Sequence, residues 1–239
     1  MGTHTLREDY LRSMGIDVWV RRDLPAAESS PVTEDAAECR KGGDDGDAPI
    51  SRMSWEMLRG RVANCTACEL HRGRTQTVFG VGDEKARWMI IGEAPGADED
   101  RQGEPFVGRA GQLLNRMLLA LGLARSDVFI ANILKCRPPN NRDPQLDEVA
   151  HCQPYLMRQI ELINPGVVLA VGRIAAQQLL GSTVSLGKLR GRVHQLPALN
   201  TPVVVTYHPA YLLRSPHDKR KAWIDLCFAK QQLGTASSN

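Results

Sequence analysis

Residues 88–100 read WMIIGEAPGADED, an apolar run that passes directly into a loop rich in glycine, proline and acidic residues. A short unbroken apolar run bounded by turn signals is typical of a strand that is buried on both faces of a sheet. Similar runs follow along the chain, at residues 128–134 (VFIANIL), 166–171 (GVVLAV) and 203–207 (VVVTY). Together these runs predict four buried strands.

Helices are predicted between the strands, because apolar residues there recur at helical spacing. The expected helices cover residues 54–63, with Ser54 as the cap, and residues 113–121, 149–163, 173–180 and 217–232. Strands that alternate with helices form a parallel sheet covered on both faces. We therefore expect an α/β fold, a three-layer α/β/α sandwich with a central, mostly parallel four-stranded sheet.

The loops that follow the strands carry the candidate chemistry. In an open parallel sheet the ligand binds at the carboxyl ends of the strands, so the loops after residues 92, 132 and 207 are expected to converge. The first loop contains Glu93 and Glu99 among glycines that permit close backbone approach. A carboxylate placed there can orient or deprotonate water, although many acidic loops are simply solvated.

Two further polar residues follow predicted strands. Asn132 ends the second strand, where its amide offers both a donor and an acceptor to a flat polar ligand, or else caps a turn. His208 comes directly after the last strand and can donate a hydrogen bond to a developing anion, or can serve the fold alone. Their expected position at one edge of the sheet makes both of them candidate site residues.

Composition limits the class of protein. The chain has 239 residues, of which 42% are hydrophobic and 24% charged, the balance of an ordinary soluble globular protein. No apolar run approaches the roughly 18 residues that a membrane span needs. The first residues, MGTHTLREDYLRSMG, lack an apolar signal core, so we expect a cytoplasmic protein rather than a membrane protein or a secreted disulfide scaffold.

The chain divides into three parts by composition and charge. Residues 1–23 contain a short amphipathic segment that could contact a protein partner, and residues 24–50 are expected to form a flexible acidic linker. Residues 51–239 form the expected catalytic or binding domain, with 24 Lys and Arg against 16 Asp and Glu. That basic excess fits a polyanionic partner, or a solvated basic surface.

Four of the six cysteines have spacings that suit a shared metal centre. Cys65 and Cys68 form a CxxC pair, and Cys136 and Cys152 flank a loop that leads into the next predicted helix. Four thiolates can hold either a zinc ion or an iron–sulfur cluster, and buried thiols without metal are the third alternative. Cys39 and Cys227 are expected to take no part.

At this point the sequence resembles the family-4 uracil-DNA glycosylases, the iron–sulfur branch of the uracil-DNA glycosylase superfamily. The resemblance covers about residues 58–230, and its motifs are specific only in combination. They are CTACELHRGRTQTVFGVG, GEAPGADEDRQGEPFVGRAGQLL, ANILKCRPPNNRDP, the spacing to Cys152, and HPAYLLR.

The resemblance implies a role for each matching residue. Cys65, Cys68, Cys136 and Cys152 would ligate a [4Fe–4S] cluster. Phe106 would stack on uracil flipped out of DNA, Asn132 would read its Watson–Crick edge, and His208 would stabilise negative charge on uracil O2. The 208–214 loop would enter the minor groove, with Leu212 or Leu213 filling the vacated stack and Arg214 near phosphate.

One position departs from the wider superfamily. Ala94, expected to line the base pocket, stands where members with the best-understood mechanism carry a water-activating Asp. That role would fall to Glu93 or Glu99, of which we favour Glu93, or else bound water would be positioned without a strong base. The implied protein is a monomeric enzyme that acts on uracil in single- or double-stranded DNA. A non-catalytic iron–sulfur DNA-binding module associated with replication or repair is the main alternative, and an electron-transfer protein is a weaker one.

Overall fold

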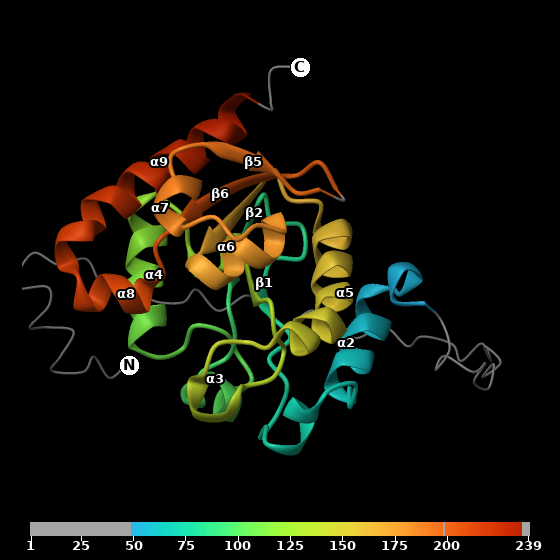
Figure 1. Ribbon diagram of the computed structural model, residues 1–239. Helices are drawn as coiled ribbons and strands as arrows, with labels where there is room; N and C mark the ends of the chain where they lie inside the picture. The colour runs from blue at the N-terminus through green and yellow to red at the C-terminus, as the bar shows by residue number, and fades with distance from the viewer. Residues whose placement is uncertain (1–48, 198, 236–239) are drawn as a thin grey trace, which may run out of the picture. The chain divides into compact units, whose positions relative to one another are not determined.

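The computed structural model of the chain describes residues 49–197 and 199–235, and within them one mixed six-stranded sheet. The strands lie in the order β1-β3-β2-β4-β6-β5 (Figure 1). Their bounds are β1 Val81–Gly82, β2 Trp88–Gly92, β3 Phe129–Asn132, β4 Val167–Val171, β5 Val193–Gln195 and β6 Pro202–Thr206. The four inner strands are mutually parallel and confirm the four predicted strands, whereas β1 and β5 add short antiparallel edges that were not predicted.

Helices cover both faces of the sheet. The α-helices are α2 Trp55–Ala63, α3 Ala97–Gln102, α4 Arg109–Ala120, α5 Leu146–Ile163, α6 Arg173–Leu180, α7 Leu186–Leu189, α8 Pro209–Arg214 and α9 Lys219–Thr235. Short 3-10 turns are η1 Ile50–Arg52, η2 Glu69–Arg72, η3 Arg125–Asp127, η4 Pro139–Asn141 and η5 Pro216–Asp218. All five predicted helices are present, and the Ser54 side chain caps α2 by accepting from the Met57 N–H.

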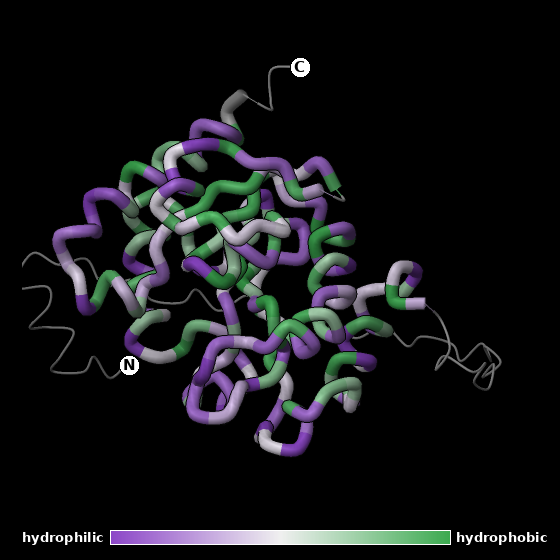
Figure 2. Tube along the Cα trace, viewed as in Figure 1, coloured by the Kyte–Doolittle hydropathy of each residue, from purple (hydrophilic) through white to green (hydrophobic). Residues whose placement is uncertain are grey.

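The three-layer prediction is confirmed by two separate apolar clusters. One cluster packs α2, α5 and α6 against strand residues such as Met89 and Ile91. The other packs α4 and α9 against the alternate residues, such as Trp88 and Ile90, on the opposite face. Side chains of a strand alternate between faces, so a strand that is apolar at every position joins both clusters. Figure 2 shows that the strands are mostly hydrophobic, whereas hydrophilic and hydrophobic residues alternate along the helices around them.

Two segments that were expected to be loops contain short helices. The acidic loop after β2 folds into α3, and the predicted 208–214 loop is the helix α8, with Pro209 at its first position. Proline is favoured there because its missing N–H would have no partner in the first turn of a helix. Residues Pro209 to Arg214 therefore have a fixed helical backbone rather than an irregular one.

The predictions for residues 1–23 and for most of the 24–50 linker lie outside the described residues. The last residue of the predicted linker, Ile50, begins η1, which packs against the apolar cluster beneath α5. None of the helices described in 49–197 and 199–235 has the length and the apolar character that a membrane crossing requires.

Candidate functional site

The carboxyl ends of the inner strands border one cavity of about 470 Å³. Gly92 at the end of β2 is the register partner of Asn132 at the end of β3, so the loops that follow begin side by side. The convergence predicted for the loops after residues 92, 132 and 207 is therefore confirmed. The cavity is lined by Glu93, Ala94, Pro95, Gly96, Glu99, Phe106, Ala110, Asn132, Pro138, Asn141, Arg142, His208, Ala210 and Arg214.

Phe106 and Asn132 meet at the floor of this cavity over a glycine. Both side chains are almost fully buried, at 6% and 2% exposure. A Cβ on Gly92 would lie 2.4 Å from the Asn132 Oδ1 and 2.7 Å from the Phe106 ring. Gly92 therefore gives the ring and the amide the space to lie together, an arrangement that suits a flat polar molecule needing both stacking and hydrogen bonds.

His208 enters the cavity as a neutral imidazole. Burial is the main reason that its pKa falls from 6.5 to about 4, with the nearby positive charge of Arg214 adding to the effect. The Ala210 backbone N–H donates to Nδ1 at 3.1 Å, so Nδ1 is the acceptor nitrogen and the proton resides on Nε2. The side chain thus carries one N–H donor, which is what a developing anion needs from a neutral group.

Glu93 follows β2 directly and has an unusual acidity. The pKa of its carboxyl is raised from 4.5 to about 7, mainly by burial and in addition by the negative charge of Asp143, while Arg173 opposes the rise. A carboxyl whose pKa lies near neutrality exchanges a proton readily at working pH. Ala94 lies beside it on the cavity wall with no titratable group.

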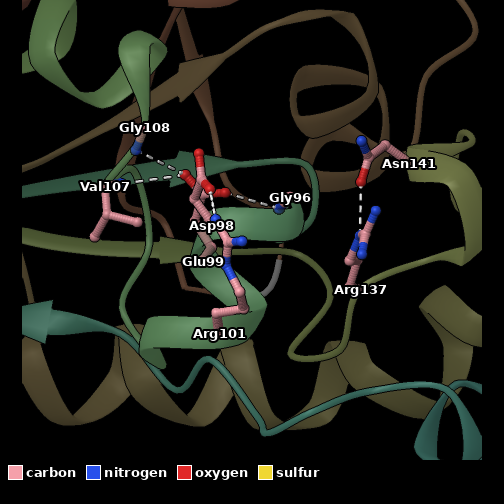
Figure 3. A network of polar contacts seen from close by, with 8 residues as sticks. All are labelled: Gly96, Asp98, Glu99, Arg101, Val107, Gly108, Arg137 and Asn141. Atoms are coloured by element: carbon pink, nitrogen blue, oxygen red, sulfur yellow. Dashed lines mark hydrogen bonds and ion pairs between the residues drawn. The ribbon is translucent and has the colours of Figure 1, made fainter.

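Glu99 has a different environment, because both of its carboxylate oxygens already accept backbone hydrogen bonds. Figure 3 shows Oε2 accepting from the Gly96 N–H at 3.1 Å and Oε1 accepting from Val107 and Gly108 at 3.1 and 3.4 Å. Glu99 therefore joins the start of α3 to the segment that follows Phe106. These contacts favour a bracing role over the water-activating role considered from the sequence.

The opposite wall of the cavity is formed by the loop after β3. There the Arg137 Nε donates to the Asn141 Oδ1 at 2.8 Å, a contact drawn in Figure 3 apart from the Glu99 network. Arg142 in the same loop makes a two-pronged ion pair with the buried Glu148, which holds the loop on the first turn of α5. Neither Asn141 nor Arg142 had been singled out for this cavity from the sequence.

The four paired cysteines line a second, smaller cavity between η2, the loop after β3, and α5. Protein donors already point at the sulfurs: the Arg74 guanidinium at Cys136, the Lys135 backbone N–H at Cys152 and the Tyr155 hydroxyl at Cys65. Within residues 49–197 and 199–235, no group of three or more His, Cys, Asp or Glu side chains is arranged to hold a single metal ion. Cys227 lies apart on α9, and Cys39 is outside the described residues.

The residues expected to contact DNA lie on α8, and they differ in their exposure to solvent. Leu212 is 1% exposed and packs beside a groove between α4 and α9, so it is not available to enter a base stack in this arrangement. Leu213 is 36% exposed, and Arg214 reaches the rim of the cavity. Of the two leucines, only Leu213 is exposed to solvent.

Arg125 is a residue that no motif had pointed to. It lies in η3, before β3, and its guanidinium donates to the backbone carbonyls of Pro105 and Phe106. A contact between a side chain and the backbone of a distant loop leaves no spacing pattern in the sequence, which is why it could not be anticipated.

Comparison with known proteins agrees with this geometry. Residues 79–230 match the family model of the uracil DNA glycosylase superfamily. The type-4 uracil-DNA glycosylase of Archaeoglobus fulgidus is 47% identical over 161 residues, 65% of this chain and 81% of that protein. The type-4 uracil-DNA glycosylase of Thermotoga maritima is 47% identical over 161 residues, 67% and 83% of the two chains. A type-5 uracil-DNA glycosylase of Pyrobaculum aerophilum is 36% identical over 149 residues, 55% and 64%.

Proposed function

The chain belongs to the uracil DNA glycosylase superfamily and, within it, to the type-4 enzymes, and from this membership we propose that it excises uracil from DNA. The reaction is hydrolysis of the N-glycosidic bond, which releases free uracil and leaves an abasic site. The observation that carries the proposal is the single cavity that holds an aromatic ring, a buried amide, a neutral imidazole and a carboxyl with a pKa near 7.

Recognition requires the target nucleotide to leave the helix. Unstacking and unpairing a base costs a few kcal/mol, which contacts inside the enzyme must offset. We assign Phe106 to stack on the flipped base and the Asn132 amide to bond its Watson–Crick edge. The buried position of both residues supports this assignment, because hydrogen bonds and stacking gain most where water is excluded.

The bond-breaking step separates charge. As the glycosidic bond lengthens, the sugar develops oxocarbenium character and the departing base becomes negative. A neutral donor at the base and a carboxylate on the sugar side stabilise opposite ends of that separation. We assign the His208 Nε2–H to the base oxygen, which fits an imidazole that stays neutral down to a pH of about 4.

Water activation falls to Glu93 in this proposal. Its carboxyl borders the cavity and titrates near neutral pH, whereas Ala94 beside it has no acid–base chemistry. Both oxygens of Glu99 are occupied by backbone N–H groups, so Glu99 serves better as a brace of the loop that carries Phe106. Glu93 therefore orients the attacking water and accepts its proton.

The cysteine cavity fits an iron–sulfur cluster by its donor set. Four thiols line one space, two of them buried, and an arginine, a backbone N–H and a tyrosine hydroxyl face the sulfurs. Cys65, Cys68, Cys136 and Cys152 would hold a [4Fe–4S] cluster, as proteins hold such clusters by four cysteines. When bound, the cluster supplies a structural crosslink that ties η2 and α5 to the strand end that carries Asn132.

We propose that the enzyme is monofunctional, acts as a cytoplasmic monomer on single- or double-stranded DNA, and uses residues 1–23 to contact a replication or repair protein. Leu213 and Arg214 are proposed to contact the DNA strand, because both are exposed and Arg214 lines the cavity.

A strand-cleavage assay tests the function. A labelled oligonucleotide with one uracil is incubated with excess cluster-loaded protein and then treated with alkali, which breaks the strand at abasic sites. Cleavage at the uracil alone, and only after alkali, is the expected result. Equal binding to uracil-containing and normal DNA without cleavage would instead favour the non-catalytic DNA-binding module.

A further inference from the structure

Phe106 has a backbone conformation that its side chain does not favour. Its φ is +54°, in the left-handed region, where a bulky residue is an outlier. Such a conformation is strained and persists only where the surrounding contacts enforce it. The loop around Phe106 must therefore be held by specific contacts.

One set of contacts holds the N–H groups that follow Phe106. The Glu99 carboxylate accepts from both Val107 and Gly108, as Figure 3 shows. On the next helix, Gly111 allows close approach, because a Cβ there would lie 1.7 Å from the Phe106 carbonyl oxygen. The loop is thus pressed against the start of α4.

A second set holds the carbonyls, and it comes from one side chain. The Arg125 Nη2 donates to the Pro105 oxygen at 2.5 Å, and Nη1 donates to the Phe106 oxygen at 3.4 Å. The same Nη1 donates to the Asn115 Oδ1 at 3.1 Å, which orients the guanidinium from α4. The guanidinium presents its donors in a rigid planar fork that matches these three acceptors, whereas a lysine ammonium directs its three donors from one atom on a flexible stem.

We propose that Arg125 is a positioning residue of the base pocket, which acts by holding Phe106 in its left-handed conformation with the ring facing the flipped base. Arg125 does not itself line the cavity, and it reaches the lining through the backbone carbonyls of Pro105 and Phe106. The expected effect of Arg125 on uracil excision rests on the proposed function. Its expected effect on the Phe106 loop does not.

The test compares Arg125→Gln and Arg125→Lys with the matched control Arg52→Gln, which removes the same charge from an exposed position in η1. Single-turnover excision of uracil is measured for each, together with affinity for uracil-free DNA. Amide hydrogen exchange is followed at Val107 and Gly108, and at core strand β4 as an internal reference. The Gln and Lys changes are then repeated in a Phe106→Ala background.

Arg125→Gln is expected to slow excision by about 10- to 100-fold, the effect of a misplaced binding group, while affinity for uracil-free DNA stays within about two-fold. Exchange at Val107 and Gly108 should accelerate, with β4 unchanged. The excision rate of Arg125→Lys should lie between those of wild type and Arg125→Gln. This variant also provides the comparison with wild type if Arg125→Gln does not fold. In the Phe106→Ala background, the loss from Arg125→Gln should shrink below about two-fold, because coupled residues are non-additive.

Three results would overturn the inference: wild-type excision by Arg125→Gln, an equal loss with and without Phe106, or unchanged exchange at Val107 and Gly108. If the wild-type protein released no uracil, the proposed function would fail. The exchange measurement would still decide whether Arg125 holds the Phe106 loop.

Discussion

The rings of Phe106 and His208 lie with their centroids 5.5 Å apart and their planes inclined by 30°. Phe106 comes from the loop before α4 and His208 is the N-cap residue of α8, so the contact joins segments that are distant in the chain. A stacking ring and a hydrogen-bond donor are thereby fixed at one wall of the cavity. Asn132, which ends β3, and Glu93, which directly follows the adjacent strand β2, line the same cavity.

Gly92→Ala should disable this arrangement with a single methyl group. The new Cβ would stand 2.4 Å from the Asn132 Oδ1 and 2.7 Å from the Phe106 ring, so both groups must move. We expect uracil excision at single turnover to fall by about 10²-fold while the protein stays folded. Gly60→Ala in α2 is the matched control, since its Cβ would meet nothing within 4 Å. Similar rates for the two variants would contradict this account of the pocket floor.

The pH dependence of the excision rate should reflect the ionisation of Glu93. The carboxylate is the active form and its pKa is about 7, so the excision rate should rise with pH through neutrality and level off above it. Glu93→Gln should lower the plateau by about 10²-fold or more and abolish the rise. A pH profile for Glu93→Gln that keeps the rise near pH 7 would assign the ionisation to another group.

Stability should change with pH in the opposite direction. The folded-state pKa of Glu93 is raised above the ordinary value of 4.5, so the fold is favoured when this group is protonated. That contribution is complete below about pH 4.5 and is lost as the pH rises through about 7. In thermal unfolding, the melting temperature of Glu93→Gln minus that of wild type should therefore be larger at pH 8 than at pH 4.

His208→Ala should lower the single-turnover rate by about 10²-fold or more, the usual effect of removing one transition-state donor. Because the pKa of His208 is about 4, the wild-type rate should show no ionisation of a histidine between pH 6 and 7. His208→Gln, which keeps an N–H donor of similar reach, should recover part of the loss. A near-normal rate for His208→Ala would assign this residue to the fold alone.

The four cysteines of the smaller cavity lead to a prediction about folding. Cys136→Ser should remove the visible absorption of the cluster and most of the soluble protein, because a crosslink between η2, α5 and the end of β3 is lost. Cys227→Ser is the control, because Cys227 lies on α9 apart from that cavity. A folded, colourless and fully active Cys136→Ser protein would contradict a structural role for the cluster.

The inner sheet was predictable from sequence because each of its strands is buried on both faces and is therefore apolar throughout. The edge strands were not, since β1 spans only Val81–Gly82 and β5 only Val193–Gln195, and neither contains an apolar run. Their pairing is set by neighbouring strands rather than by their own residues. The sequence of α3, ADEDRQ, likewise has no apolar face that would indicate a helix.

The position of the site was also predictable, because the carboxyl ends of parallel strands share one edge of the sheet. The different surroundings of the two glutamates were not predictable. Glu93 and Glu99 lie in the same acidic loop, and only the three-dimensional contacts show that one is free at the cavity while the other is bonded to backbone N–H groups. The sequence likewise could not distinguish Leu212 from Leu213. In the structure, the helical turn of α8 buries Leu212 and exposes Leu213.

The most direct test of the central claim measures free uracil and abasic sites in the same reaction. Cluster-loaded full-length protein is mixed in excess with an oligonucleotide that contains one uracil, and an identical oligonucleotide with thymine serves as the reference. We predict one released uracil for each abasic site and no release from the thymine strand. Tight binding of the uracil strand by cluster-loaded protein, with neither uracil nor abasic sites formed, would contradict the account.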